Sequence, residues 1–455
     1  MHVVVVGGGV SGAVAAYRLR GALGDGAAIT LVEATDSLGG KLRTAEVAGV
    51  RYDVGAEAFL ARRPEGVGLA AELGLELVHP GKARSTVRAG GRVAPLPGRT
   101  LMGIPGSPDA VAEVLSDAGR ARVAAEPDLP PVTLESDTAL GALLRERFGD
   151  ELVDRLVDPL LGGVYAGGAD GLGLRATVPA LATAIDRGAP SLTAAAASLI
   201  PATPSSAPVF GTLPGGLGTL VDRLVELAKP DIRLGRPVTA LRRRESGWQL
   251  EIGDELIDAD AVLLAVPAPA ARKLLDGVAP AASSALGEVE LASMAVVAMA
   301  LPPGTELPDA SGVLIGARER RADGEPFAAK AFTFSTRKWP HLDTGPVLVR
   351  GSVGRFREPG ALHRDDDDLV RLVRDDLAEL TGITAEPIDV VVTRWGGGLP
   401  QYGPGHLDLV ERAERAVAEL PGLALAGAAL HGVGVPACIA TATAAATRIT
   451  SQLVR

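Results

Sequence analysis

A glycine-rich turn near the start of the chain has the spacing that holds a dinucleotide phosphate. Gly7, Gly9 and Gly12 form a G-x-G-x-x-G pattern directly after an apolar run at residues 3–6. The first glycine would make the tight turn, the second would admit a pyrophosphate, and the third would let helix and strand pack closely. Glu33 lies about 20 residues further on, where a carboxylate accepts hydrogen bonds from a ribose. These residues predict dinucleotide binding and leave NAD and FAD open.

Two segments after Glu33 favour FAD over NAD. Gly39, Gly40 and Lys41 follow after a short loop, and residues 52–60 form the second segment. Paired glycines let backbone lie close to a cofactor, and a lysine there can offset pyrophosphate charge. Both segments resemble parts of the flavin amine oxidase superfamily, in which the second lies beside the isoalloxazine ring. The resemblance therefore implies FAD.

The far end of the chain is similar to the segment that closes the FAD site in flavoproteins of the glutathione-reductase type. An apolar run at residues 423–425 precedes Gly427, and the small residues of 431–439 lead into an alanine- and threonine-rich stretch. Small residues let a helix N-terminus approach a flavin, where its dipole stabilises negative charge on the reduced ring. Cys438 is interpreted as a small buried residue and His431 as a packing residue.

Segments in the middle of the chain resemble the oxygen-dependent porphyrinogen oxidases, in the form found in the coproporphyrin-dependent branch of haem synthesis. The resemblance covers nearly the whole chain. It is carried by residues 158–167, 172–177, 213–220, 337–341 and 394–402. The Gly-Gly-Val-Tyr-Ala-Gly and Lys-Trp-Pro-His sequences among them are more specific than the two ends.

The predicted fold class is α/β with α+β insertions. We expect a discontinuous Rossmann FAD domain, like that of glutathione reductase, with inserted substrate-binding and helical domains. The FAD domain is expected over residues 1–80, 206–275 and 395–455. A mainly helical insert is expected over 85–205 and the substrate-binding domain over 276–394.

The fingerprint and the resemblance together imply a set of FAD contacts. In the family, the residue matching Val238 presents its backbone to the adenine. The expected contacts are Gly7, Gly9, Val10, Ser11, Gly12, Glu33, Ala34, Gly40, Lys41, Gly55, Ala56, Glu57, Ala58, Val238, Trp395, Gly427, Val433, Gly434, Val435 and Ile439. Relatives often have Gly-Pro where this chain has Gly55-Ala56, and arginine where it has Lys41.

The resemblance implies removal of six electrons from a porphyrinogen, with molecular oxygen as oxidant and hydrogen peroxide as by-product. The flavin N5 would accept hydride, so no protein residue is assigned a catalytic role and no metal is expected. A porphyrinogen carries propionates, which require local cations on an acidic protein. Arg63, Tyr165 and Lys338 are the expected substrate contacts.

Composition excludes several other classes of protein. Lysine and arginine number 45 against 55 aspartate and glutamate, a net charge of −10, which argues against nucleic acid as a partner. One cysteine excludes an internal disulfide framework and multi-thiolate metal sites, and fits a reducing cytoplasm. No signal peptide or membrane-spanning helix is expected. Peripheral membrane contact and product handover to a ferrochelatase stay open, and the oligomeric state is not predicted.

The motifs leave the choice of substrate open. Coproporphyrinogen III oxidation is the first hypothesis and protoporphyrinogen IX oxidation the second. An amine oxidase or a carotenoid desaturase shares the two ends of the chain, although no clear aromatic pair is found and a desaturase would not need basic residues near Arg63. A non-catalytic flavin or tetrapyrrole carrier is the remaining alternative.

Overall fold

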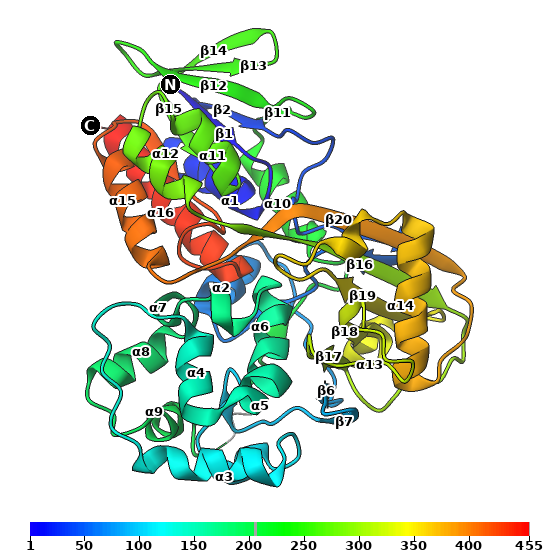
Figure 1. The fold of residues 1–455 in the computed structure, drawn as a ribbon. Helices are drawn as coiled ribbons and strands as arrows, with labels where there is room; N and C mark the ends of the chain where they lie inside the picture. Colours follow the sequence, from blue (N-terminus) through cyan, green and yellow to red (C-terminus); the bar gives the residue numbers. More distant parts are fainter. Residues whose placement is uncertain (204–206, 455) are drawn as a thin grey trace.

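Three regions make up the molecule in the computed structural model, which describes residues 1–203 and 207–454 (Figure 1). Both chain ends lie in the first region, a parallel sheet with helices. The second region is helical, and the third is a mixed sheet flanked by one long helix. The predicted domain boundary at residues 205 and 206, and the last residue of the predicted FAD domain, lie outside the described residues.

The first region is built on a parallel sheet that joins distant parts of the chain. Its strands are short and fully apolar in the centre because helices or strands cover both faces. The strand order is β11 (Asp231–Arg233), β2 (Ala28–Val32), β1 (His2–Val6), β15 (Ala261–Leu264) and β21 (Leu423–Leu425). The sheet therefore combines strands from all three segments expected in the FAD domain.

Two hydrophobic clusters cover this parallel sheet. On one face lie α1 (Val10–Leu23), α10 (Gly218–Ala228) and α16 (Val435–Leu453), with α2 (Pro64–Glu72) beside α16. On the other face lie β12 (Val238–Arg243), β13 (Trp248–Ile252), β14 (Glu255–Ala259), α11 (Ala268–Leu275), α12 (Pro280–Gly287) and α15 (His406–Ala418). Thus α12 packs with α11 and α15, although it falls in the predicted substrate-binding segment.

The helical region packs around its own apolar core. A π-helical turn over Val153–Val157 immediately precedes α6. The helices are α3 (Asp117–Ala125), α4 (Leu140–Phe148), α5 (Asp150–Leu152), α6 (Asp158–Tyr165), α7 (Leu174–Thr177), α8 (Pro179–Asp186) and α9 (Leu192–Leu199). In Figure 1 they lie below the parallel-sheet region and to the left of the mixed sheet, with α6 on the side of the mixed sheet.

The mixed sheet has seven strands. They follow the order β20 (Asp389–Pro400), β16 (Leu291–Leu301), β19 (Val347–Val353), β18 (Ala329–Phe334), β17 (Gly312–Ile315), β6 (Ser85–Ala89) and β7 (Arg92–Pro95). The last two strands come from the predicted helical insert. One face packs on α14 (Asp366–Thr381), whose N-cap Asp365 accepts a hydrogen bond from Asp368 N at 2.8 Å. The acidic run 365–368 therefore forms the N-cap and first turn of α14, where negative charge is favourable.

Short elements link the three regions. A hairpin and two further strand pairs lie in the connections between the longer elements, and α13 precedes β19. They are β3 (Thr44–Val47) with β4 (Val50–Asp53), β5 (Phe59–Leu60) with β10 (Phe210–Gly211), β8 (Thr100–Leu101) with β9 (Ile104–Pro105), and α13 (Ser335–Lys338). Because β5 pairs with β10, the segment that follows β4 is held against residues about 150 positions later in the chain.

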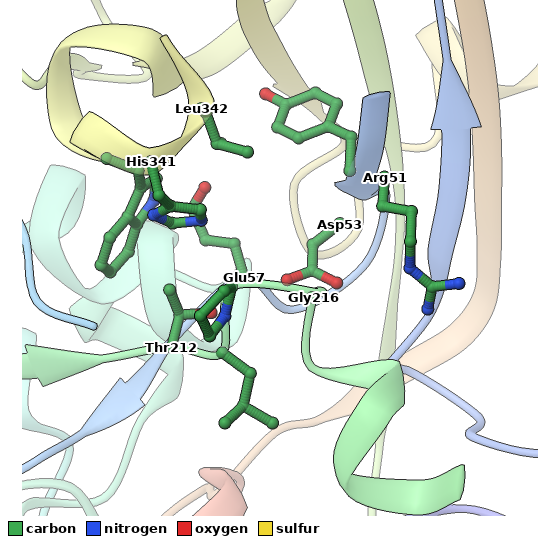
Figure 2. Close-up of a pocket in the computed structure, with 11 residues that line it drawn as sticks. Arg51, Asp53, Glu57, Thr212, Gly216, His341 and Leu342 are labelled. Atoms are coloured by element: carbon green, nitrogen blue, oxygen red, sulfur yellow. The ribbon is translucent and has the colours of Figure 1, made fainter. Parts of the chain in front are cut away.

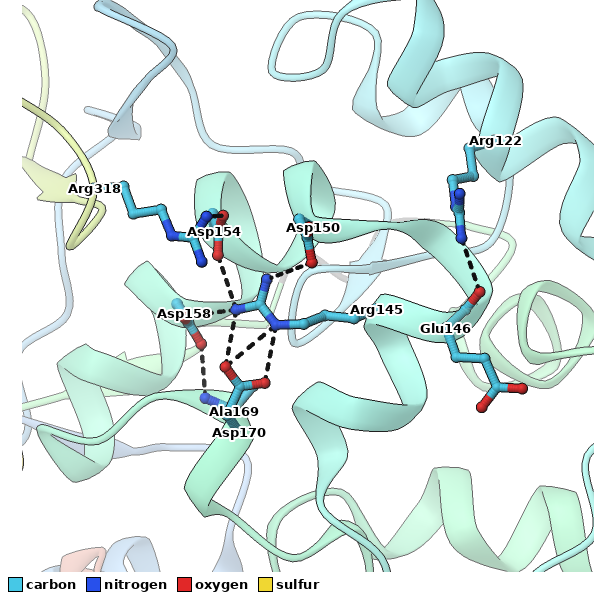
Figure 3. A network of polar contacts seen from close by, with 9 residues as sticks. All are labelled: Arg122, Arg145, Glu146, Asp150, Asp154, Asp158, Ala169, Asp170 and Arg318. Carbon is cyan, nitrogen blue, oxygen red and sulfur yellow. Dashed lines mark hydrogen bonds and ion pairs between the residues drawn. The ribbon is translucent and has the colours of Figure 1, made fainter.

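Arg145 holds the beginning of α6 in place (Figure 3). Its guanidinium bonds or pairs with carboxylates from four positions: Asp150, Asp154, Asp158 and Asp170. Asp158 in turn accepts a hydrogen bond from Ala169 N at 2.7 Å. A planar guanidinium that satisfies several carboxylates has a fixed geometry. The network therefore fixes the first turn of α6 against α4 and the loop that follows α6.

Among the residues with described positions, no helix is both long enough and apolar enough to cross a membrane.

Candidate flavin and substrate site

The glycine fingerprint forms a turn that fits a pyrophosphate. Gly7 has a φ of 106°, and a Cβ on Gly12 would lie 1.8 Å from the Gly7 carbonyl oxygen. Around a Cβ on Gly9 there is no atom within 4 Å, so this glycine faces open space. Gly9 caps α1 without a side-chain hydrogen bond, and the first turn holds no acidic residue. Val10 and Ser11 therefore lie at a positive helix end that suits an anion.

Glu33 lies at the end of β2 with its carboxylate turned back to the glycine turn. The carboxylate accepts hydrogen bonds from Gly8 N at 2.7 Å and from Thr35 N at 2.8 Å. Arg236 N donates to the Glu33 carbonyl at 3.0 Å, which brings the start of β12 beside β2. The chain thus places Val238 near Glu33 and Ala34, which is the arrangement required for the ribose and adenine end of FAD.

The Gly39–Lys41 segment crosses the fingerprint. Gly39 N donates to the Gly8 carbonyl at 2.9 Å, and a Cβ on Gly40 would lie 3.2 Å from the Gly9 Cα. Gly40 also has a φ of 54°, a conformation that glycine adopts without strain. The predicted contacts of the two glycine segments therefore meet in one place.

Lys41 is a cation without a carboxylate partner in the described chain. Burial lowers the pKa of its ammonium group. A Cβ on Gly398 would lie 3.5 Å from Lys41 Cε and 2.8 Å from the Cβ of Trp395, so β20 passes beside Lys41. Trp395 and Lys41, which are far apart in the sequence, thus belong to one neighbourhood.

The segment around Gly55 runs along residues 41–43. A Cβ on Gly55 would lie 2.2 Å from the Lys41 carbonyl oxygen, which explains why only glycine fits there. The same oxygen accepts a hydrogen bond from Ala56 N at 2.9 Å. Ala58 packs in a small apolar cluster with β4. The flavin-proximal segment is therefore held by backbone contacts to the segment that crosses the fingerprint.

The N-terminus of α16 meets the N-terminus of α1. Ser11 Oγ lies 3.4 Å from the Cys438 carbonyl oxygen, and Gly427 N donates to Thr441 Oγ1 at 3.1 Å. Gly434 caps α16 without a side-chain hydrogen bond, and no acidic residue lies in the first turn. Val433 precedes this cap, while Val435 and Ile439 pack in the core beneath it. Two positive helix ends thus face the same region, as a bound flavin requires.

Glu57 is largely buried and lies between two cations. Its carboxylate is ion-paired with the Lys338 ammonium group and lies 3.5 Å from Arg350 Nε. Burial alone would raise the pKa of Glu57, but Arg350 and Lys338 hold that pKa at about 2. Arg350 also donates to the carbonyl oxygens of Asp53 and Gly55, each at 2.8 Å. We call Glu57, Lys338 and Arg350 the compensated cluster; it fastens the flavin-proximal segment to β19.

A small polar cavity of about 20 Å³ lies beside Glu57 (Figure 2). Asp53 borders it and accepts hydrogen bonds from Thr44 Oγ1 at 2.6 Å and Leu217 N at 3.0 Å. Burial raises the pKa of Asp53 to about 6 in spite of these hydrogen bonds. Thr212 Oγ1 and His341 Nδ1 also border the cavity and are buried without a hydrogen-bond partner. The volume is enough for about one water molecule.

The other two predicted substrate residues lie apart from the compensated cluster. Arg63 precedes α2, is 54% exposed and pairs with Glu65 at 2.9 Å. Tyr165 ends α6, is buried, and its ring centre lies 5.7 Å from that of Tyr402. The structure therefore brings Lys338 to Glu57 but does not bring Arg63 or Tyr165 to the same point.

Sequence reasoning missed the charged residues of the mixed sheet. Arg350 lies in the apolar strand β19, and Lys330 lies in β18 between two alanines. A single charge in an otherwise apolar strand is a signal that could have identified both, because such a charge is costly unless something pairs with it.

Comparison with known proteins agrees with this geometry. Residues 10–450 match the family described as flavin containing amine oxidoreductase. The chain is 46% identical to coproporphyrinogen III oxidase of Mycobacterium tuberculosis, over 99% of this chain and 97% of that one. It is 33% identical to coproporphyrinogen III oxidase of Bacillus subtilis, over 96% and 95% of the two chains.

A solved structure from Exiguobacterium, named for protoporphyrinogen oxidase, has the same fold. Its TM-score is 0.87 at 32% identity, and the match covers 99% of this chain and 98% of that one. The predicted α/β class with a discontinuous FAD domain and the predicted flavin cofactor are confirmed, whereas the individual contact residues stay predictions. The chain belongs to the flavin-containing amine oxidoreductase family, together with proteins named coproporphyrinogen III oxidase.

Proposed function

We propose that this protein oxidises coproporphyrinogen III to coproporphyrin III. Six electrons and six hydrogens leave the substrate in three two-electron steps, and three oxygen molecules are reduced to three hydrogen peroxide molecules. The observation that carries the proposal is the 46% identity, over almost the full chain, to a relative named for this activity. The positive helix ends, glycine cradle and uncompensated Lys41 suit a flavin, as this reaction needs.

The residues of the site would bind and orient rather than react covalently. FAD, when bound, supplies the hydride acceptor and passes electrons to oxygen. The N-termini of α1 and α16 offer N–H groups to negative charge, and Glu33 is placed for the ribose. The compensated cluster keeps the segment at Gly55–Ala58 in position.

Oxidation of protoporphyrinogen IX is the second candidate. The Exiguobacterium structure named for that activity is 32% identical to this chain, so the family likeness extends to both substrates. The two substrates differ in charge: coproporphyrinogen III carries four propionates and protoporphyrinogen IX carries two.

The deciding experiment is aerobic turnover of FAD-loaded protein with each porphyrinogen. We expect the kcat/KM for coproporphyrinogen III to exceed that for protoporphyrinogen IX at least tenfold, measured by porphyrin fluorescence. Three molecules of peroxide should form for each porphyrin, and a rate proportional to the concentration of FAD-loaded protein separates catalysis from spontaneous oxidation, which also reduces oxygen. A preference for the dicarboxylate would assign the second candidate. No turnover of either would return the amine oxidase, desaturase and carrier hypotheses.

The cellular setting belongs to the same proposal. A single cysteine in 455 residues fits the reducing cytoplasm. Coproporphyrin III is a free-base porphyrin, so the next enzyme in haem synthesis must insert iron, and handover to a ferrochelatase follows from that chemistry. Contact with a membrane surface is tested by sedimentation of the protein with vesicles.

A further inference from the structure

Lys330 is a buried cation without a counter-charge. It is 5% exposed, and its ammonium group has no hydrogen bond or ion pair within the described chain. Burial, together with the nearby charge of Arg355, lowers the pKa of Lys330 to about 7. A buried charge is strongly unfavourable unless a partner compensates it. No hydrogen bond or ion pair of the described chain requires a lysine at this position.

A β-bulge turns Lys330 toward the interior face of the mixed sheet. Ala329 pairs with Val353, but Ala331 pairs with Ser352, so Lys330 is an extra residue in β18. In a bulge two residues oppose one partner, and bulges re-aim side chains near functional sites. Lys330 and Ala331 therefore share the face of Ser352, which is also the face of Arg350. Val353 belongs to the opposite face, in the core that includes α14.

Arg355 is the second cation beside this face. Burial lowers the pKa of its guanidinium, which donates a hydrogen bond from Nη2 to the Ile315 carbonyl at 3.1 Å. Carboxylates of Glu358, Asp376 and Asp158 act on it only from a distance, since none forms an ion pair with it. The next residue, Phe356, donates its N–H to the Ala166 carbonyl at 2.6 Å, so Arg355 lies at the end of α6.

The facing surface of α6 leaves room for a ligand. No atom lies within 4 Å of a Cβ on Gly162, and a Cβ on Gly163 would meet only Leu314 Cδ2, at 3.9 Å. Each glycine inside a helix costs about 1 kcal/mol relative to alanine, so helix stability does not explain the pair. Because α6 packs near β17 and β18 (Figure 1), the two glycines leave this part of the helix surface without side chains.

We propose that Lys330 and Arg355 bind a carboxylate of the substrate, a propionate of the porphyrinogen, with the macrocycle lying between the Gly162–Gly163 face of α6 and the mixed sheet. The inference rests on the proposed function and specifies which residues recognise its substrate. A guanidinium and an ammonium group together match the two oxygens of one carboxylate. The described chain provides no carboxylate partner for Lys330, so the bound propionate supplies the counter-charge. Elsewhere the net charge of −10 repels such a substrate.

The test compares Lys330→Met and Arg355→Lys with wild-type protein and with Lys273→Met. Lys273 is exposed on α11, so the control removes a lysine charge without touching the proposed site. Lys330→Met keeps the length and burial of the side chain, and Arg355→Lys keeps the charge but removes the planar fork. FAD content and thermal unfolding establish that each protein is folded. The first readout is the Kd for coproporphyrin III, from fluorescence titration of FAD-loaded protein without turnover. The second is KM against kcat for coproporphyrinogen III.

We expect at least a tenfold rise in both Kd and KM for Lys330→Met, a smaller rise for Arg355→Lys, and less than a threefold change in kcat. If both variants are folded and bind within twofold of wild type, the inference is overturned while the proposed function stands. If the wild type neither binds nor oxidises the coproporphyrin compounds, the proposed function and the inference both fail. Should Lys330→Met not fold, Arg355→Lys decides by the same criterion.

Discussion

Two groups of largely buried charges lie on the same face of the mixed sheet, and they differ in whether a carboxylate pairs with the cations. In the compensated cluster, Glu57 lies between Lys338 and Arg350, and the carboxylate offsets the cations. On the neighbouring strand, Lys330 has no carboxylate partner, and Arg355 beside it has none. A paired charge can fasten two segments together, whereas an unpaired one costs stability until a ligand arrives. The difference indicates a structural role for the compensated cluster and a ligand-binding role for Lys330 and Arg355.

Glu57→Gln should break the compensated cluster and have the largest effect. Lys338 and Arg350 would keep their charges without the carboxylate, and leaving a buried charge unpaired costs about 3 kcal/mol. We expect a corresponding loss of unfolding free energy in urea, with reduced FAD content because the Gly55 segment loosens. Glu46→Gln, on an exposed position of β3, is the matched control. A Glu57→Gln protein as stable as the control would show that the compensated cluster does not fasten the Gly55 segment to β19.

Asp53→Asn tests whether the charge of the Asp53 carboxylate is offset by its surroundings, as the charge of Glu57 is. The pKa of Asp53 is raised to about 6, so the folded state binds the proton more tightly than the unfolded state does. Proton binding to Asp53 therefore stabilises the folded state at low pH, and this stabilisation is lost as pH rises through about 6. Relative to wild type, the unfolding free energy of Asp53→Asn should therefore rise by about 1.4 kcal/mol between pH 5 and pH 8.

The measurement for Asp53→Asn is urea unfolding at four pH values, with Asp25→Asn at an exposed turn as the control. If the unfolding free energies of wild type and Asp53→Asn change in parallel with pH, then Arg350 and the hydrogen bonds already compensate this carboxylate fully.

Lys330→Met should change stability in the opposite direction from Glu57→Gln. Replacing an uncompensated buried ammonium group with an apolar side chain of similar length should raise the unfolding free energy by about 1 kcal/mol. Added coproporphyrin III should then stabilise the wild type more than the variant, because ligand that binds only the folded state shifts the unfolding midpoint. Lower stability of ligand-free Lys330→Met would place Lys330 among the structural charges.

Arg63→Ala should have the smallest effect. The side chain is 54% exposed and paired with Glu65 only, and such surface pairs contribute about 0.5 kcal/mol or less. We expect unchanged stability and about a twofold rise in KM for coproporphyrinogen III, as for a cation that attracts the substrate at low salt. A tenfold rise that persists at high salt would move the main carboxylate site from Lys330 to Arg63.

The sequence by itself determined the cofactor end of the molecule. Gly7, Gly9, Gly12 and Glu33 lie within one strand–helix–strand unit, so their spacing along the chain is also their arrangement in space. The flavin family was predictable for the same reason, since its motifs are short and contiguous.

Only the tertiary structure decided how charge is distributed at the substrate end. Glu57 meets Lys338 and Arg350 across almost 300 residues, so no local pattern could pair them. The bulge that places Lys330 on the interior face arises from the register of β18 against β19, which depends on the packing of the whole sheet. A charge in a strand can be read from the sequence, but whether it has a partner is settled by the fold, because compensation acts through space.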